Sequence, residues 1–214
     1  MPKPKTRDRI LDTAQRLFNS ERYGNVTTAK LAAAAGISEG NLWYHFREKR
    51  AILDAISERF LAQCERRLAI EPARADVLQG YVAYLRVLAE EMRDFRFMYR
   101  DQADYGEHSA ALLARLPAIY RRTISQFRSF LDGLRKAGHL SVARDRIEPL
   151  AVNIVIVLRF YMEFAREAGL PPAGANALIA QSFALHLGLL EGALTAEAAA
   201  FLHGNLVDAE LSAA

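Results

Sequence analysis

Hydrophobic residues recur along the first part of this chain at the spacing of an amphipathic helix. They occupy the positions i, i+1, i+4, i+7 and i+8 of one helical face: Ile10, Leu11, Ala14, Leu17 and Phe18. Thr6 precedes this stripe and is expected to cap the helix. Gly24 follows it, where we expect the left-handed residue that often ends a helix. The pattern therefore predicts a first helix between Thr6 and Gly24.

A second, shorter helix is expected to begin after Thr27. The hydroxyl group of Thr27 is suited to accept a backbone N–H at the start of a helix. Val26 and Leu31 flank this cap at the spacing of a hydrophobic staple, in which the two side chains pack together. The predicted helix then runs through A-K-L-A-A-A-A and stops at Gly36.

The same signals repeat directly after this glycine. Ser38 is the second predicted cap, and Ile37 and Leu42 are placed to form a second staple. Two short capped helices are thus joined by a tight turn at residues 35–37. This spacing is typical of a helix-turn-helix.

Beyond residue 47 the predicted helices become longer. A stripe from Ile52 to Leu68 ends at Pro72, and further helical patterns cover about residues 76–92, 95–105, 109–137, 147–167, 174–192 and 196–210. Pro117 is expected to kink its segment or to start a new helix within it. Residues 152–158 are rich in β-branched side chains and also fit a buried strand, but helical spacing continues after them. We therefore predict an all-α fold with an N-terminal three-helix domain and a larger C-terminal helical domain.

The composition indicates a soluble protein. The chain has 214 residues, 51% of them hydrophobic, enough for one ordinary domain or for a small domain joined to a larger one. Its single cysteine, Cys64, excludes an internal disulfide and fits a reducing compartment. There is no signal-peptide pattern and no apolar run near the roughly 20 residues of a membrane span. We expect a cytoplasmic protein with no membrane partner.

The charge is divided unevenly between the two predicted parts. Residues 1–50 contain ten Lys and Arg against five Asp and Glu, a net charge of +5. The remaining residues contain eighteen against twenty, a net charge of −2. This division favours an N-terminal module that faces a polyanion, although a basic segment is also often no more than a solvated surface.

The second helix of the predicted helix-turn-helix has the properties of a helix that enters a DNA groove. The major groove of B-DNA admits one α-helix, whose first residues face the bases and the phosphates. Gly40 would allow a close approach to DNA, and its cost of roughly 1 kcal/mol inside a helix suggests a reason for its presence. Leu42 and Phe46 are four residues apart and can face inward together. Trp43, Tyr44 and His45 then point outward.

The segment I-S-E-G-N-L-W-Y-H-F-R-E-K resembles the signature of the tetracycline-repressor (TetR) family of regulators. The family pattern is matched by Leu42, Tyr44, His45, Phe46 and Lys49. The stretches I-L-D-T-A-Q-R-L-F, T-T-A-K-L-A-A-A-A-G-I-S and K-R-A-I-L-D-A-I are similar to the family's first helix, second helix with its turn, and start of the fourth helix. The resemblance is dense over residues 6–60, and beyond residue 60 it rests on length and helical layout. It implies a DNA-binding domain at residues 1–50 and a ligand-binding and dimerisation domain at residues 51–214.

The resemblance also implies which residues contact double-stranded operator DNA: Thr28, Ser38, Gly40, Trp43, Tyr44, His45 and Lys49. Two positions depart from the family pattern. Glu39 stands where basic or small residues are frequent, and an acid near phosphate is unfavourable unless it accepts from a cytosine amino group. Trp43 replaces the usual Tyr and removes a hydroxyl. Operator preferences therefore do not transfer from relatives.

Several of these residues also have purely structural interpretations. Trp43 could pack against the first helix as part of the core. His45 could be a structural hydrogen-bonding residue, and Arg47 and Lys49 could be solvated.

Dimerisation is expected on physical grounds as well as from the resemblance. One helix-turn-helix makes few contacts, whereas a two-fold dimer reads two half-sites. Residues 174–192 are apolar almost all round the predicted helix, with small residues at Ala180, Ala184, Gly188 and Gly192. Pairing this helix with residues 147–167 would give a four-helix interface between subunits, and burial within one subunit is the alternative.

A small-molecule pocket would need converging aromatic residues and a few polar groups. The densest such stretch is F-R-F-M-Y-R-D-Q-A-D-Y at residues 95–105. The candidate ligand-binding residues are Tyr84, Phe95, Met98, Tyr99, Tyr120, Phe127, Asn153 and Tyr161. Aromatic residues at helical spacing are more often plain core, so each of these also has that interpretation.

An enzyme is disfavoured by the motifs that the sequence lacks. It has no zinc-binding H-E-x-x-H or Cys/His cluster, no nucleophile elbow, no P-loop and no dinucleotide fingerprint, so we predict no metal and no cofactor. Glu163 and Glu167 share a helix face, but Arg159 and Arg166 flank them, and surface pairing explains them. We predict a homodimeric repressor that binds a palindromic operator and is released by a small-molecule effector. The alternatives are a regulator that acts through protein partners and an activator without small-molecule induction.

Overall fold

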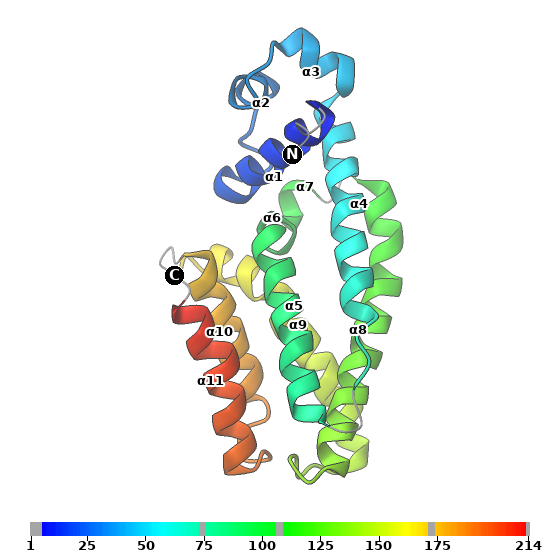
Figure 1. Cartoon of the computed structure of the whole chain (residues 1–214), viewed down its shortest axis with the longest axis vertical. Helices are drawn as coiled ribbons and strands as arrows, with labels where there is room; N and C mark the ends of the chain where they lie inside the picture. Colours follow the sequence, from blue (N-terminus) through cyan, green and yellow to red (C-terminus); the bar gives the residue numbers. More distant parts are fainter. Residues whose placement is uncertain (1–5, 73–75, 106–108, 171–173, 213–214) are drawn as a thin grey trace.

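The computed structural model of the chain describes residues 6–72, 76–105, 109–170 and 174–212. These residues form eleven α-helices and one 3-10 turn (Figure 1): α1 (Thr6–Glu21), α2 (Thr28–Ala34), α3 (Glu39–His45), α4 (Lys49–Leu68), α5 (Val77–Asp94), α6 (Arg96–Arg100), α7 (Gln102–Tyr105), α8 (Ala110–Lys136), η2 (Arg144–Arg146), α9 (Ile147–Glu167), α10 (Ala175–Gly188) and α11 (Ala196–Ser212). Among them the only β-type pairing is one isolated antiparallel bridge, between Leu140 and Leu194. The predicted all-α fold is confirmed.

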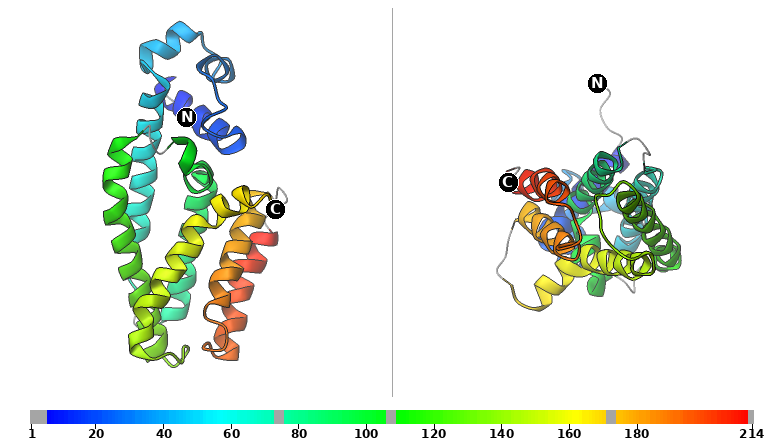
Figure 2. Two further views of the ribbon diagram at one scale, coloured as in Figure 1. Left: turned by 180° about the vertical axis from the view of Figure 1, so that it is seen from behind. Right: turned by 90° about the horizontal axis from the view of Figure 1, so that it is seen from below.

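The molecule is elongated, with a small head at one end. Figure 1 shows α1, α2 and α3 gathered at the top, and α4 descending from them along the body beside α8. Because α4 begins at Lys49, it runs through the position where the sequence divides the two domains. Figure 2 shows α9 crossing the body obliquely, while α10 and α11 pack against each other along one side. No helix in the described ranges is long and apolar enough to span a bilayer.

Most of the predicted long helices are confirmed, including the choice of helix over strand at residues 152–158, which lie within α9. Pro117 lies inside α8, which continues past it, so no new helix starts there. The predicted helix at 95–105 is wrong in one respect, because non-helical Asp101 divides it into α6 and α7. The predicted helix at 174–192 is too long: α10 ends at Gly188, and Gly192 has a φ of 78° in the turn that follows.

The end of α1 also differs from the prediction. The left-handed residue is Arg22, with a φ of 75°, and not Gly24. A non-glycine residue pays a steric penalty in this conformation, of order 1 kcal/mol. The side chain of Arg22 offsets this steric penalty, because it reaches the body of the protein.

Candidate DNA-binding site and ligand cavity

The predicted capping residues build the helix-turn-helix. The side chain of Thr27 accepts the backbone N–H of Lys30, and that of Ser38 accepts the N–H of Asn41. Between the two helices, Gly36 has a φ of 64° and donates its N–H to Ala33, while the next N–H bonds back to Ala32. This pair of bonds is a Schellman motif, which requires a left-handed residue and so explains the glycine.

The two faces of α3 have opposite environments. Leu42 and Phe46 are buried in the head, as predicted from their spacing of four residues. Trp43 is 40% exposed and Tyr44 is 85% exposed, so neither belongs to the core, and the core interpretation of Trp43 is wrong. The ring of His45 is half-buried and meets the Tyr44 ring edge-on at 5.3 Å between centroids. The helix therefore presents an aromatic surface to solvent.

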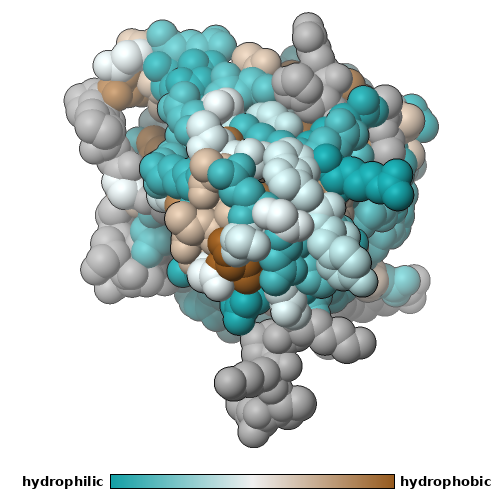
Figure 3. All heavy atoms as spheres, turned by 90° about the horizontal axis from the view of Figure 1, so that it is seen from above, coloured by the Kyte–Doolittle hydropathy of each residue, from teal (hydrophilic) through white to brown (hydrophobic). Residues whose placement is uncertain are grey.

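The structure brings most of the predicted DNA-contact residues to one end of the molecule. Ser38, which caps α3, and Gly40 within α3 are exposed, and Thr28 is half-buried at the start of α2. A Cβ atom placed on Gly40 would have only the Ser38 hydroxyl near it, 4.0 Å away, so packing within the chain does not explain this glycine. The view from above this end shows a mostly hydrophilic surface around a small hydrophobic cluster (Figure 3).

Lys49 has a different environment from the other predicted contact residues. Its amine donates to the backbone carbonyl of Tyr23 and lies 4.1 Å from the centroid of the Tyr23 ring. Burial lowers the pKa of this amine. In this conformation Lys49 ties the start of α4 to the loop between α1 and α2. Its predicted contact with phosphate would compete with that bond.

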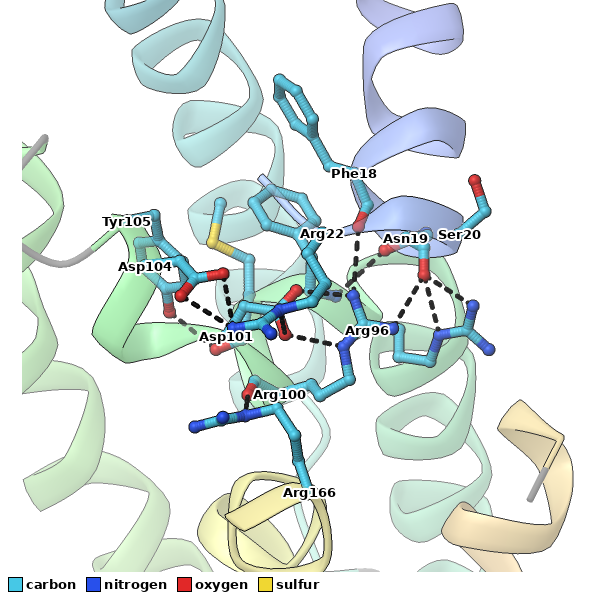
Figure 4. Close-up of polar contacts among 12 residues, drawn as sticks. Phe18, Asn19, Ser20, Arg22, Arg96, Arg100, Asp101, Asp104, Tyr105 and Arg166 are labelled. Atoms are coloured by element: carbon cyan, nitrogen blue, oxygen red, sulfur yellow. Dashed lines mark hydrogen bonds and ion pairs between the residues drawn. The ribbon is translucent and has the colours of Figure 1, made fainter. Parts of the chain in front are cut away.

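A polar junction joins the head to the body at the end of α1 (Figure 4). Arg96 of α6 donates to the backbone carbonyl of Asn19 at 2.6 Å, and Arg100 donates to the same carbonyl at 3.0 Å. The Asn19 side chain accepts a hydrogen bond from the Phe97 N–H at 3.0 Å and donates one to the Asp94 carbonyl at 2.8 Å. Cationic side chains at the last carbonyls of a helix are favourable, so this arrangement both caps α1 and fixes its position on α6.

Arg22 completes the junction through ion pairs. Its guanidinium donates to the carboxylate of Asp104 at 2.8 Å and lies 3.5 Å from the buried carboxylate of Asp101. Asp101 is also bonded by Arg100, and Arg166 of α9 donates to the Arg100 carbonyl at 3.3 Å. The junction therefore connects α1, α6, α7 and α9 (Figure 4).

The body contains a small, mainly apolar cavity of about 40 Å³. It lies between α4, α5, α6, α8 and α9, and it is lined by Phe60, Cys64, Arg67, Leu88, Glu91, Tyr99, Leu116, Ile119, Tyr120, Thr123, Phe127, Val155, Leu158 and Arg159. A site for a drug-sized ligand occupies roughly 300–1,000 Å³. The cavity in this conformation would therefore have to enlarge to hold such a ligand.

Three of the predicted ligand-binding residues line this cavity, namely Tyr99, Tyr120 and Phe127. Tyr84 lies one step behind the wall, where its hydroxyl accepts from Arg67. Phe95 and Met98 are buried in the core without lining the cavity.

The structure does not bring the last two predicted residues to the cavity. Asn153 is exposed on α9, and Tyr161 is half-buried with its hydroxyl bonded to Gln181 at 2.9 Å. Both lie on α9, but the residues of that helix which line the cavity are Val155, Leu158 and Arg159. The helix pattern alone did not identify which face of α9 turns inward.

A buried ionic network forms one wall of the cavity. Arg67 donates to the Glu91 carboxylate at 2.9 Å, and the Tyr99 hydroxyl donates to the same carboxylate. The Cys64 thiol lies 3.4 Å from it. Burial raises the pKa of both the thiol and the Tyr99 phenol, so both groups stay protonated beside the carboxylate.

Sequence reasoning missed the charged residues of the cavity. Arg67, Glu91 and Arg159 were not predicted to line it, and Arg159 was interpreted as a surface residue that pairs with Glu163 or Glu167. Arg166 does form those two pairs, at 3.8 and 2.8 Å, but Arg159 is 8% exposed and forms neither. The only sequence signal that Arg159 is buried was that its neighbours Val155 and Leu158 lie on an apolar face of the helix.

Comparisons with known proteins agree with this architecture. Residues 10–56 match the family model described as bacterial regulatory proteins, tetR family, and residues 59–202 match the one described as bacterial transcriptional repressor. The tetracycline repressor protein class D of Escherichia coli is 34% identical over 97 residues, which cover 45% of this chain. The chain thus spans less than half of that relative, 42% of its length.

Solved structures extend the likeness over nearly the whole chain. A TetR-family transcriptional regulator from Marinobacter aquaeolei VT8 has a TM-score of 0.75 at 25% identity, covering 98% of this chain and 97% of its own. A structure titled SmeT–triclosan complex has a TM-score of 0.55 at 22% identity, covering 90% and 93%, and shows the fold alone. The HTH-type transcriptional regulator AcrR of Shigella flexneri is 36% identical over 53 residues, which cover 25% of this chain and 25% of its own. The two matched segments, together with the head and body that they cover, show that this chain belongs to the TetR family of bacterial transcriptional regulators.

Proposed function

We propose that the chain represses transcription by binding a palindromic operator as a homodimer, with residues 1–50 as the DNA-binding part and residues 51–214 as the sensing part. The observation that carries this proposal is the division of α3 into a buried side, Leu42 and Phe46, and an exposed aromatic side, Trp43 and Tyr44. Exposed aromatic rings are costly to leave in water and suit contacts with sugars and thymine methyl groups.

The proposed dimer interface lies on α9 and α10. Three exposed residues follow one face of α9 at intervals of four, Ile156, Phe160 and Phe164, and exposed Leu185 of α10 and Leu189 at its C-terminal cap extend this face. An apolar stripe on two packed helices favours a four-helix contact with a second copy. A two-fold dimer would hold two α3 helices at the spacing of successive major grooves.

The proposed release by a small molecule rests on the cavity and the junction. α6 contributes Tyr99 to the cavity wall, and its Arg96 and Arg100 hold the end of α1. A ligand that binds better when the cavity is enlarged would therefore favour a different position of the head, and by linkage would lower operator affinity. The name of the SmeT–triclosan complex shows that a protein of this fold holds a small molecule.

The experiment that tests the proposal is DNA binding by the purified chain. Fluorescence anisotropy with DNA from upstream of its own gene should give an affinity at least 1,000-fold higher than with scrambled DNA of equal length, the lower bound typical of specific regulators. Equal affinity for both DNAs would reject specific regulation. Sedimentation of the free protein as a monomer at micromolar concentration would reject the dimer.

The proposed phosphate contact of Lys49 needs a separate measurement, because its amine already donates to the backbone carbonyl of Tyr23. If Lys49 contacts phosphate, Lys49→Ala should reduce the slope of log affinity against log salt by about 1 and weaken operator and random DNA alike. An unchanged slope would assign the amine to the Tyr23 carbonyl alone.

A further inference from the structure

We propose that the effector of this protein is an apolar molecule with a carboxylate group, and that Arg159 receives this carboxylate in the cavity. The inference rests on the proposed ligand response and adds to it the chemical class of the ligand. It follows from the charges in the cavity wall, from the partners of Arg159 and from the position of those partners in the junction.

The charges in the cavity wall do not balance. The wall contains three ionised side chains, Arg67, Glu91 and Arg159. Arg67 and Glu91 neutralise each other at 2.9 Å, and both are almost fully buried. Arg159 is left with a positive charge at a mostly apolar cavity, so the cavity wall carries a net charge of about +1.

The partners of Arg159 are all neutral. Its Nε donates to the Tyr120 hydroxyl at 3.0 Å, one terminal nitrogen donates to the Gln102 side chain at 2.9 Å, and the other lies 3.5 Å from the Tyr99 carbonyl. The guanidinium also lies over the rings of Tyr99 and Phe160, at 5.2 and 5.1 Å from their centroids. Because an Arg has five N–H groups, some remain for a ligand.

No carboxylate in the described part of the chain lies within 4 Å of the Arg159 guanidinium. Glu163, one helical turn further along α9, is the carboxylate that would be expected to pair with Arg159. Its carboxylate instead accepts the Ala103 N–H at 3.2 Å and lies 3.8 Å from Arg166. Burying a charge without a counterion is unfavourable, and a bound anion would offset that cost. A planar carboxylate matches the fork of N–H groups on Arg.

The other side chains of the cavity wall indicate the chemistry of the part of the ligand that carries the carboxylate. Around the three charged side chains, the cavity is lined by four aromatic rings and by aliphatic side chains: Phe60, Tyr99, Tyr120, Phe127, Leu88, Leu116, Ile119, Val155 and Leu158. An aryl or alkyl body would bury its apolar surface here. The geometry therefore favours an aromatic or fatty carboxylic acid over a sugar, a peptide or a polyamine.

The partners of Arg159 also connect ligand binding to the head. Tyr99 and Gln102 are the α6 and α7 residues that hold its guanidinium, and they flank Asp101 in sequence. Asp101 and Asp104 are the carboxylates that face Arg22 of the head. A ligand carboxylate that takes N–H groups of Arg159 competes with Gln102 and with the Tyr99 carbonyl. It would thereby weaken the hold of α9 on the segment that positions α1.

The test compares acids with uncharged molecules of the same shape. The probes are 2-naphthoate with 2-naphthamide, and decanoate with decan-1-ol, titrated into the full chain by calorimetry at neutral pH. At least one acid should bind about tenfold or more tightly than its neutral counterpart, as one charge-assisted hydrogen bond supplies. Arg159→Met should reduce this ratio to near one. Arg159→Lys, which keeps the charge and loses the fork, should give an intermediate ratio.

Arg128→Gln is the matched control, because this exposed arginine of α8 lies outside the cavity. It should leave the ratio unchanged. Equal affinity of acid and neutral probe, absence of binding by every probe, or a ratio that survives in Arg159→Met would each overturn the proposal. If Arg159→Met fails to fold, the ratio of acid to neutral-probe affinity in the wild type and in Arg159→Lys still tests the proposal. Operator binding is measured separately, so an acid that binds without releasing DNA would reject the release mechanism and keep the ligand class.

Discussion

The head and the body of this protein use aromatic side chains in opposite ways. In the head, Trp43 and Tyr44, which we propose to contact DNA, are exposed, and Tyr44 has 85% of its surface in solvent. In the body, Tyr99 at the cavity and Tyr84 behind its wall are buried, and their hydroxyl groups bond to charged residues, Tyr99 to Glu91 and Tyr84 to Arg67. The exposed aromatic residues that would contact DNA therefore carry little of the fold, whereas the residues that would contact ligand also hold the core together.

This difference predicts how each region should respond to substitution. In the head, folding and DNA binding should be separable, because different faces of α3 serve them. In the body, a substitution in the cavity wall should alter stability and ligand binding together. The following substitutions test that contrast.

The largest effect is expected from Glu91→Gln. The substitution leaves the Arg67 guanidinium buried without a counterion, since the carboxylate that now accepts from it at 2.9 Å is gone. Breaking one side of a buried ion pair should lower the free energy of unfolding by about 3–5 kcal/mol. Urea denaturation followed by circular dichroism measures this loss.

The control for this substitution is Glu58→Gln, which removes an exposed partner of Arg115. An exposed ion pair contributes at most about 1 kcal/mol, so this variant should remain close to the wild type. Similar losses in the two variants would show that the Arg67–Glu91 pair is not specially important to the body.

In the head, the matched pair is Leu42→Ala and Tyr44→Ala. Leu42 is fully buried, and its truncation should lower the free energy of unfolding by about 2–5 kcal/mol. Tyr44→Ala should change stability by no more than about 0.5 kcal/mol and should weaken operator binding. Denaturation and fluorescence anisotropy on both variants measure the two effects. A strongly destabilised Tyr44→Ala variant would contradict the idea that different faces of α3 serve folding and DNA binding.

The body should also show a specific loss of stability in mild acid. His186 is fully buried, and its ring nitrogen Nε2 lies 2.7 Å from the Tyr81 hydroxyl. Burial lowers the pKa of His186 to about 3, from 6.5 in an unfolded chain. Between these values the unfolded chain binds the additional proton, so the contribution is complete above pH 6.5 and is lost as the pH falls. Its loss from pH 7.5 to 5.0 should be about 2 kcal/mol.

His186→Gln provides the comparison, because glutamine keeps a polar partner for Tyr81 and does not titrate in this range. The loss of stability between pH 7.5 and 5.0 should be about 2 kcal/mol smaller in this variant than in the wild type, whatever its stability at neutral pH. Identical pH dependence in the two proteins would show that His186 does not titrate as its burial implies.

The smallest change in stability is expected from Gly40→Ala. A Cβ atom at this position meets only the Ser38 hydroxyl at 4.0 Å, and alanine favours helix by up to roughly 1 kcal/mol. The variant should therefore be as stable as the wild type or slightly more so. Its operator affinity should nevertheless fall, because the methyl group would occupy space at the DNA surface. Unchanged operator affinity would remove Gly40 from the interface.

These contrasts also explain which features the sequence could predict. The caps at Thr27 and Ser38, the turn at Gly36 and the inward side of α3 depend on residues a few positions apart, so local spacing predicts them. The cavity depends on five helices that meet only in the folded chain. Tyr99, Tyr120 and Phe127 were identified by residue type, but Asn153 could not be excluded without knowing the rotation of α9.

Charged residues were the hardest to place from sequence. Arg159 stands close to Glu163 in the helical repeat, which is the usual pattern of a surface pair, yet tertiary packing turns it into the core. The helix boundary at Asp101 was missed for the same reason, because its buried carboxylate faces Arg22 of the head. Such partners are distant in sequence and leave no periodic signal.

The left-handed Arg22 has a consequence for protein engineering. A chimera that joins residues 1–48 to the body of another regulator would bring this strained backbone with it but would leave Asp101 and Asp104 behind. The new protein would then carry the steric cost without the ion pairs that offset it. A functional exchange of DNA-binding heads would have to transfer the two aspartates as well, or replace Arg22 with glycine.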